Sequence, residues 1–322
     1  MQNEYTYAVA RIRAKEMSLL SKTDIDTLMS CHSLDECIRF LADKGWADCS
    51  DGNFEKMLSS EEDKLWSLIN ELTNGDKIFD VFRYPTDFHN LKASIKSVVT
   101  DVKEPQIFFL DRGTTDANNI YKAIKEKDFD SLSEHLRECA KKAYHTLLQT
   151  GDGQLCDIII DKANLEYIRN VTKNSKCTLL KDYGELTVAS ADIKIAVRCL
   201  KTSKNHDFIK NALADCDTLN ITLLAENASK TLDDIYNYLA YTDYSDALEY
   251  LKKSPSEFER YCDNILMEKI KEQKLNNFTA APIAAYFLAR QNEIKTVRLI
   301  LSGKQNDIDE NIIRERLRDM YV

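Results

Sequence analysis

The chain has 322 residues, with 53 acidic and 44 basic side chains and a formal net charge of -9. This length accommodates about two or three domains of roughly 100–200 residues each. The acidic balance and the absence of a basic run argue against nucleic acid as a partner, because binders of phosphate usually carry a basic face. The same balance does not favour direct binding to anionic lipid headgroups.

Glycine and proline are scarce in this sequence. Eight Gly and four Pro fall well below the usual ~7% and ~5%. Folds made of strands need many turns, and turns draw on both residue types for their special backbone angles. The composition therefore predicts an all-α fold of long helices joined by few loops.

The nine cysteines do not predict a disulfide framework. Their number is odd, the chain is long, and the opening MQNEYTYAVARIRAKE contains no apolar signal core. We therefore expect a reduced, cytoplasmic protein. The longest mostly apolar stretch, residues 280–289, is far shorter than the ~20 residues that span a bilayer, so we expect no membrane insertion.

Apolar residues recur at helical spacing in four segments. In chain order these are Leu65/Leu68/Ile69/Leu72, Leu132/Leu136/Cys139/Ala143/Leu147, Ile294/Val297/Leu301 with the polar Arg298, and Ile313/Leu317/Met320/Tyr321. Each stripe covers one face, so each predicted helix needs a partner to bury it. The last stripe predicts a C-terminal helix over residues 309–321.

Capping patterns mark two helix starts. Ser33 is a candidate cap residue with an acid, Glu36, three residues later. Ser254 is a second candidate cap, followed by a proline at the first helical position, Pro255, and by an acid, Glu257. All four prolines lie at such starts or between stripes: Pro85, Pro105, Pro255 and Pro282. The apolar run at residues 157–161 resembles a strand in isolation, but its surroundings favour helix.

Three segments share a layout in which an Asn is followed by an apolar helix, a glycine and a further helix. The asparagines are Asn90, Asn164 and Asn292, and the glycines are Gly113, Gly184 and Gly303. The further helices are expected to begin near Asp116, Asp192 and Asp309, where the helix dipole favours negative charge.

This layout predicts three divergent helical repeats over residues 1–111, 112–183 and 184–322. The third repeat carries extra helices at about residues 207–253 and a closing C-terminal helix. That helix could pack against the first repeat and close a ring, and a linear solenoid is the rival arrangement. The recurring asparagines either contribute polar contacts around a central opening or satisfy a loop backbone group in each repeat. We favour the second interpretation, because repeats reuse structural solutions.

The sequence contains few motifs that could bind a nucleotide or a metal. There is no GxGxxG and no GxxxxGK, which argues against nucleotide binding of those types. The best metal candidate is the group Cys31, His32, Cys37 and Cys49. It lacks the close cysteine pairs of a zinc finger, so we interpret these cysteines as small core residues. No metal and no cofactor is predicted.

No catalytic constellation is predicted either. The histidines lie in no recognised catalytic spacing: His32, His89, His135, His145 and His206. The acid pairs Asp24/Asp26 and Asp233/Asp234 could serve as acid and base, but we interpret them as cap and first-turn residues. The chain is therefore not expected to be an enzyme.

Three stretches resemble a known family. They are YAVARIRAKEMSLLS from Tyr7, PIAAYFLA from Pro282 with EIKTVRLILSGK from Glu293, and IRERL from Ile313 with the final YV. Together they resemble the C subunits of V/A-type rotary ATPases, a family that includes the d subunit of the eukaryotic V-ATPase. One departure is Arg290-Gln291, where the family more often has Lys-Glu.

The resemblance implies three helical bundles related by pseudo-threefold symmetry, forming a funnel with a central opening. It implies a non-catalytic central-stalk subunit that couples the rotor shaft to the membrane proteolipid ring during ATP-driven or ATP-synthesising proton or sodium transport. The implied partners are the shaft subunits and the ring. One copy per complex is expected, monomeric when isolated, cytoplasmic and attached to the membrane through the complex.

Two other interpretations fit the helical layout. A cytosolic helical-repeat adaptor of another assembly would also have stacked helices and no active site. An enzyme of unknown class would need a deep pocket with convergent titratable groups.

Overall fold

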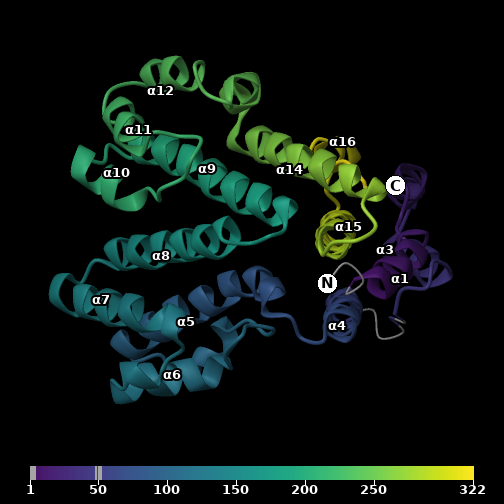
Figure 1. Ribbon diagram of the computed structural model, residues 1–322, viewed down its shortest axis with the longest axis horizontal. Helices are drawn as coiled ribbons and strands as arrows, with labels where there is room; N and C mark the ends of the chain where they lie inside the picture. The colour runs from purple at the N-terminus through teal and green to yellow at the C-terminus, as the bar shows by residue number, and fades with distance from the viewer. Residues whose placement is uncertain (1–4, 48, 50–52) are drawn as a thin grey trace. The chain divides into compact units, whose positions relative to one another are not determined.

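The computed structural model describes residues 5–47, 49 and 53–322 and consists of helices and their connections (Figure 1). No strand occurs among these residues, so the predicted all-α fold is confirmed. The chain divides into two compact units. The first unit comprises residues 1–76, 176–182 and 249–322, and the second comprises residues 77–175 and 183–248.

The first unit is organised around one long helix. Its helices are α1 (Thr6–Glu16), α2 (Lys22–Ser30), α3 (Leu34–Asp43), α4 (Phe54–Thr73), α14 (Pro255–Glu272), η5 (Gln273–Leu275), α15 (Ala281–Gln305) and α16 (Glu310–Arg314). α15 packs against α1, α3, α4, α14 and α16. Because its neighbours surround it, α15 is buried on several faces and forms the centre of this unit.

The core of the first unit joins the two ends of its sequence. Residues of α2, α3 and α4 form one apolar cluster with Ile294, Val297, Ile300 and Leu301 of α15 and with Ile313 of α16. Arg298, the polar member of the predicted stripe, forms ion pairs with Glu55 and Glu62 of α4. The stripe therefore contacts α4 through both its apolar and its polar members.

The second unit is a layered set of helices. Its helices are η1 (Lys77–Phe82), α5 (Tyr84–Val99), η2 (Pro105–Phe108), α6 (Ala117–Glu126), η3 (Phe129–Ser131), α7 (Glu134–Thr150), α8 (Gly153–Lys173), α10 (His206–Ala212), α11 (Ile221–Ala228), α12 (Leu232–Leu239) and η4 (Ser245–Ala247). α5 packs against α6, α7 and α8, and α8 lies between α7 and α10 (Figure 1). α9 (Thr178–Lys201) and α13 (Leu248–Lys253) carry residues of both units.

The predicted helix starts are confirmed. Ser254 caps α14 by accepting the N–H of Glu257 at 3.1 Å, with Pro255 as the first helical residue. Ser33 likewise caps α3, but the carboxylate of Glu36 accepts the N–H of His32 rather than that of the cap residue. Residues 157–161 lie inside α8, as expected.

The predicted C-terminal helix over residues 309–321 is wrong beyond its first turn. α16 ends at Arg314, and residues 317–322 are irregular. Tertiary contacts override the helical period: Tyr321 donates its hydroxyl to Glu16 of α1, and the N–H of Asp319 donates to Asn264 of α14. An irregular path lets nearby residues reach different helices through a backbone N–H and a side chain, which one helical face could not do.

The expectation that a glycine separates two helices in each repeat is also wrong for two of the three. Gly113 lies between η2 and α6, but Gly184 lies inside α9 and Gly303 inside α15. Asp116 and Asp309 cap α6 and α16 as expected, whereas Asp192 lies inside α9 and starts no helix.

The long helices suggest a different register for the internal repetition. They occur as sequence-adjacent pairs, α4–α5, α8–α9 and α14–α15, whose first members begin at residues 54, 153 and 255. Asn90 and Asn292 lie on second members, but Asn164 lies on a first member. Residue 184, the predicted start of the third repeat, falls inside α9, and the division into three repeats stays a prediction.

Candidate functional site

Side chains of α5 hold the chain segment that follows it. The Asn90 side chain is buried, and its amide nitrogen donates to the carbonyl of Leu110 while its amide oxygen accepts the N–H of Leu110, both at 2.8 Å. Nε2 of His89 lies 3.0 Å from the carbonyl oxygen of Phe108, to which it can only donate. Two consecutive helical residues thus fix the backbone of residues 105–110, which we name the anchored turn.

Asp87, one turn before Asn90, holds the next part of this segment. Its buried carboxylate accepts the hydroxyl of Thr114 and, at 3.1 Å, the N–H of Thr115. A Cβ at Gly113 would clash with Oδ1 of Asp87, so this close approach requires glycine. The i, i+3 spacing of Asp87 and Asn90 places both groups on one face of α5.

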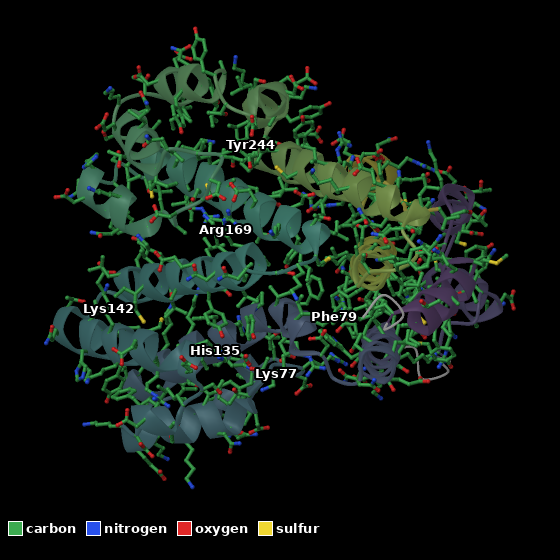
Figure 2. All side chains as sticks on the ribbon, in the orientation of Figure 1. Lys77, Phe79, His135, Lys142, Arg169 and Tyr244 are labelled. Atoms are coloured by element: carbon green, nitrogen blue, oxygen red, sulfur yellow. The ribbon has the colours of Figure 1, made fainter. Side chains whose placement is uncertain are left out.

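His135 of α7 completes this polar group (Figure 2). Its Nε2 lies 3.1 Å from Oδ2 of Asp87, and its ring stacks on Tyr167 with centroids 5.2 Å apart. The rings of Tyr84 and Phe88 also lie near it, at 5.0 and 5.9 Å. The carboxylate and the imidazole are enclosed by aromatic side chains, and this arrangement suits structural anchoring rather than reaction with a substrate.

The anchored turn presents apolar side chains to solvent. Ile107 is 71% exposed, and Phe108 and Leu110 are each 49% exposed, while Pro105 is buried. A hollow of about 510 Å³ lies beside the turn, lined by Phe109, Leu110, Asp111, Arg112, Asp116 and neighbouring residues. Neither Ile107 nor Phe108 lines this hollow, so the exposed apolar side chains and the hollow are neighbouring but separate features.

A second polar group lies inside the first unit. Arg290 of α15 pairs with Glu61 of α4 at 2.6 Å and with Glu293 one turn further along α15. Glu61 also accepts the N–H of Ala47, and Glu293 accepts the N–H of Leu20, each at 2.8 Å. The group therefore ties two helices to two inter-helix segments.

Burial has the largest effect on the pKa of Glu293 in this group. It raises the pKa of Glu293 to about 7, against the opposing effect of the Arg290 guanidinium. A raised pKa in an enzyme often marks a catalytic acid, but here the carboxylate is enclosed and bonded to structural partners. We interpret it as part of the packing of α15.

A third polar group joins α8 to α9 and to the chain after α10. Arg169 of α8, labelled in Figure 2, pairs with Glu185 of α9 at 2.8 Å and with Asp217, which Lys173 also contacts. Further along α9, buried Asp192 accepts the N–H of Ala214 at 3.0 Å, and burial raises the pKa of this carboxyl to about 8.

The three predicted asparagines behave differently. Asn90 satisfies a loop backbone group in both directions, as the favoured interpretation expects. Asn292 donates to the carbonyl of Asp319 at 3.1 Å. Asn164 shows no comparable bond, since its side-chain oxygen is buried without a hydrogen-bond partner. The structure brings none of the three into a shared site within either unit.

The three predicted glycines share a steric role. A Cβ at Gly184 would clash with the side chain of Thr172 in α8, and one at Gly303 would clash with Ile313 in α16. Gly113 makes the equivalent approach to Asp87. All three positions permit a close approach, although only Gly113 lies in a loop.

The four candidate metal residues do not form one group, although the side chains of Cys31 and Cys37 contact each other. Cys31, Cys37 and Cys49 are buried members of the core cluster, whereas His32 is exposed. Burial raises the pKa of the Cys37 thiol to about 12. Within the part of the chain that the structure describes, no three potential metal-ligating side chains come together.

The acid pairs are mainly helix-start groups. Asp24 completes a capping box with Ser21, and Asp234 bonds the side chain of the cap residue Thr231. Asp26 pairs with Arg314 at 3.0 Å. The first-turn interpretation is therefore confirmed for Asp24, Asp233 and Asp234, and it is wrong for Asp26, which lies beyond the first turn of α2.

Sequence reasoning missed the residues that hold the backbone most firmly, namely Asp87, Glu61 and Glu293. Each lies on the apolar face of a helix, where a lone carboxylate stands out against its neighbours. The available signal was this break in the apolar pattern. Across the described ranges, no helix is long and apolar enough to cross a membrane.

Comparison with known proteins gives matches over nearly the whole chain. The model of the ATP synthase (C/AC39) subunit family matches residues 8–316. The chain is 23% identical to the C subunit of the V-type sodium ATPase of Enterococcus hirae, over 99% of both chains. It is 22% identical to the C subunit of the A-type ATP synthase of Halorubrum lacusprofundi, over 97% of this chain and 96% of that protein. The corresponding protein of Methanocaldococcus jannaschii is 24% identical, over 99% of this chain and 86% of its own length.

Proposed function

This chain belongs to the ATP synthase (C/AC39) subunit family, and we propose that it is a non-catalytic subunit of a V/A-type rotary ATPase. In this role it joins the rotor shaft to the membrane proteolipid ring and transmits torque between them during proton or sodium transport. The observation that carries the proposal is the length of the match, residues 8–316. The family relationship covers nearly all of the chain, so both units belong to it.

The placement of polar groups supports a mechanical role. Asp87, Asn90 and Glu293 are buried, and they bond backbone groups of other segments of their own unit. Such bonds fix loops to helices, and close-packed helical interiors have low compressibility. A coupling must resist deformation under torque, and these features serve that requirement.

The proposal also states where the subunit lies and how many copies each complex contains. We place it on the cytoplasmic side, attached to the membrane through its complex, with one copy in each complex and a monomeric state when isolated. The three-bundle funnel with a central opening is part of the proposal, as is the insertion of the shaft into that opening. The formal charge of -9 favours partner surfaces that are basic.

The test mixes the purified chain with purified shaft subunits of the same organism, followed by size-exclusion chromatography with mass detection. A one-to-one complex is the expected result. A second run uses the detergent-solubilised proteolipid ring, and each component is also run alone. If the chain remains monomeric with both partners at low and moderate salt, the rotor role is wrong and the helical-repeat adaptor becomes the better interpretation.

A further inference from the structure

Two cysteines of the first unit lie side by side. Cys31 follows the last residue of α2, Cys37 lies on α3, and their side chains contact each other. Sγ of Cys31 donates to the carbonyl of Thr27 at 3.5 Å. Sγ of Cys37 donates to the carbonyl of Leu28 at 3.6 Å. Because these two carbonyls belong to consecutive residues of α2, the bonds keep the sulfur atoms next to each other.

The connection that carries this pair is fixed at both ends, and we name residues 27–37 the cysteine corner. Nζ of Lys304 in α15 donates to the carbonyls of Met29 and Cys31, at 2.6 and 2.7 Å. At the other end of the connection, Ser33 caps α3. Two thiols kept together in this way have a high effective concentration with respect to each other, as tethered binding groups do.

One sulfur of the pair lies nearer the surface than the other. Cys31 is 6% exposed between two exposed residues, Ser30 and His32, whereas Cys37 is completely buried. Burial raises the pKa of the Cys31 thiol and raises that of Cys37 to about 12, and the Lys304 ammonium opposes the effect at both. Because the thiolate is the attacking form, reaction begins at Cys31 when the cysteine corner opens locally.

We propose that Cys31 and Cys37 form a reversible dithiol–disulfide couple, a modification site whose oxidant is a small-molecule disulfide such as oxidised glutathione. A disulfide at this place joins the end of α2 to α3. The inference concerns the cysteine corner alone and does not depend on the proposed rotor role.

The reaction is thiol–disulfide exchange in two steps. In the first, the Cys31 thiolate attacks one sulfur of oxidised glutathione, so that a mixed disulfide forms and one glutathione leaves as its thiolate. In the second, the Cys37 thiolate attacks the Cys31 sulfur, and the other glutathione leaves. The two thiol protons pass through solvent to the two departing thiolates. Two thiols of the chain are oxidised, and one glutathione disulfide is reduced to two glutathione molecules.

The fold is expected to favour the disulfide, because it brings the two sulfurs into contact. A bond between residues only six positions apart also forms in the unfolded chain, so the relevant quantity is the ratio of the two equilibrium constants. By linkage, the factor by which folding favours the disulfide equals the factor by which the disulfide favours folding. Oxidation therefore stabilises the cysteine corner by that same factor.

The experiment equilibrates the full-length chain with reduced and oxidised glutathione near pH ~8, close to the ordinary pKa of a thiol. Parallel samples contain buffer alone or enough urea to unfold the chain. Acid quenching, alkylation of the remaining thiols and trypsin digestion without reductant follow. One tryptic peptide, residues 23–39, contains both cysteines of the pair and no other. Mass spectrometry therefore detects their disulfide as the loss of two hydrogen atoms from this peptide, whereas a bond to any other cysteine joins two peptides.

Two variants accompany the unmodified chain. Cys37→Ala removes the second sulfur, so peptide 23–39 should carry at most one glutathione, on Cys31. The matched control is Cys177→Ala, which removes another cysteine of the first unit that is also 6% exposed.

The expected result is an equilibrium constant for the internal disulfide that is at least tenfold larger in the folded chain than in urea, and the same in Cys177→Ala. A folded-state constant equal to or below the value in urea would overturn the proposal. It would also be overturned if the folded chain kept both thiols reduced, carried only glutathione on Cys31, or joined Cys31 to a different cysteine. The main comparison uses the unmodified chain, so it does not depend on whether a variant folds.

Discussion

The guanidinium of Arg290 lies over the ring of Trp46, with its central carbon 4.4 Å from the ring centroid. The same guanidinium pairs with Glu61 and Glu293, so one cation on α15 serves two carboxylates and one aromatic face. All four side chains are buried or nearly so. The group is a buried polar link between α4 and α15 within the first unit, beside the more exposed pairs of Arg298 with Glu55 and Glu62.

Replacement of Arg290 by Met is expected to destabilise the first unit strongly. The substitution keeps much of the side-chain volume but leaves buried Glu293 without its cation and leaves Glu61 with Lys64 alone. Removal of one partner of a buried ion pair typically costs about 3–5 kcal/mol. The measurement is urea unfolding near pH 7. The matched control is Arg298→Met on the same helix, which removes a cation whose side chain is 39% exposed, and a loss below about 1 kcal/mol is expected there. Equal losses for the two variants would show that burial of the network has no special importance.

Asp192 is expected to make stability depend on pH. Burial raises its folded-state pKa to about 8, whereas an unfolded Asp ionises near pH ~4. Between these values the folded state holds a proton that the unfolded state has lost. The contribution of this group to the free energy of unfolding therefore falls as pH rises from about 4 to 8 and is constant above that range.

The Asp192→Asn variant isolates this effect. The amide oxygen can still accept the N–H of Ala214, but the side chain no longer ionises. Relative to the unmodified chain, the variant should gain on the order of a few kcal/mol between pH 4 and pH 8. Urea unfolding at several pH values measures the difference. A difference that does not change with pH would contradict the raised pKa, whatever its constant size.

The sequence predicted the presence of helices better than the residues at which they begin and end. Stripes at helical spacing, the cap at Ser254 and the scarcity of glycine and proline led to the correct fold class and to α4, α7 and α15. The C-terminal helix failed because Tyr321 and Asp319 bond to α1 and α14 instead of to a helical neighbour. Such long-range contacts leave no local signal.

Only part of the candidate site could be predicted from the sequence. Asn90 was singled out because it recurred, and its role as a support for loop backbone was anticipated. The role of Gly113 depends on Asp87, which lies 26 positions earlier in the chain and becomes its neighbour only in the fold. The exposure of Ile107 and Phe108 could not be predicted from the sequence either, because an apolar run in a loop has the same residue pattern whether it is buried or faces solvent.

Gly184 and Thr172 offer a test of close helix packing in the second unit. Adding a methyl group by Gly184→Ala should cost about 1–3 kcal/mol through its clash with Thr172, offset in part by the ~1 kcal/mol by which Ala is the better helix former. The double variant Gly184→Ala/Thr172→Ala should recover part of the lost stability, because it removes Oγ1 and Cγ2 of Thr172 but keeps its Cβ, 2.7 Å from the added methyl. The Thr172 hydroxyl bonds only carbonyls of its own helix, so its removal frees no other segment. Unfolding by urea gives the four free energies of the double-mutant cycle.

The control for this cycle is Gly153→Ala at the start of α8. A Cβ there would meet only Cε of Lys96, at an ordinary 3.9 Å, so stability should stay the same or rise slightly. If Thr172→Ala gives no recovery in the Gly184→Ala background, the cost of the added methyl does not arise from Oγ1 and Cγ2 of Thr172.

Asn90→Ala is expected to release the anchored turn. The substitution removes the partner of both backbone groups of Leu110 and should cost about 1–3 kcal/mol. The diagnostic measurement is amide hydrogen exchange, which should become at least tenfold faster across residues 105–116 while amides of α7 and α8 change much less. Asn118→Ala serves as the control, because Asn118 is exposed at the start of α6. Unchanged exchange in this segment would mean that His89 and Asp87 fix the turn without Asn90.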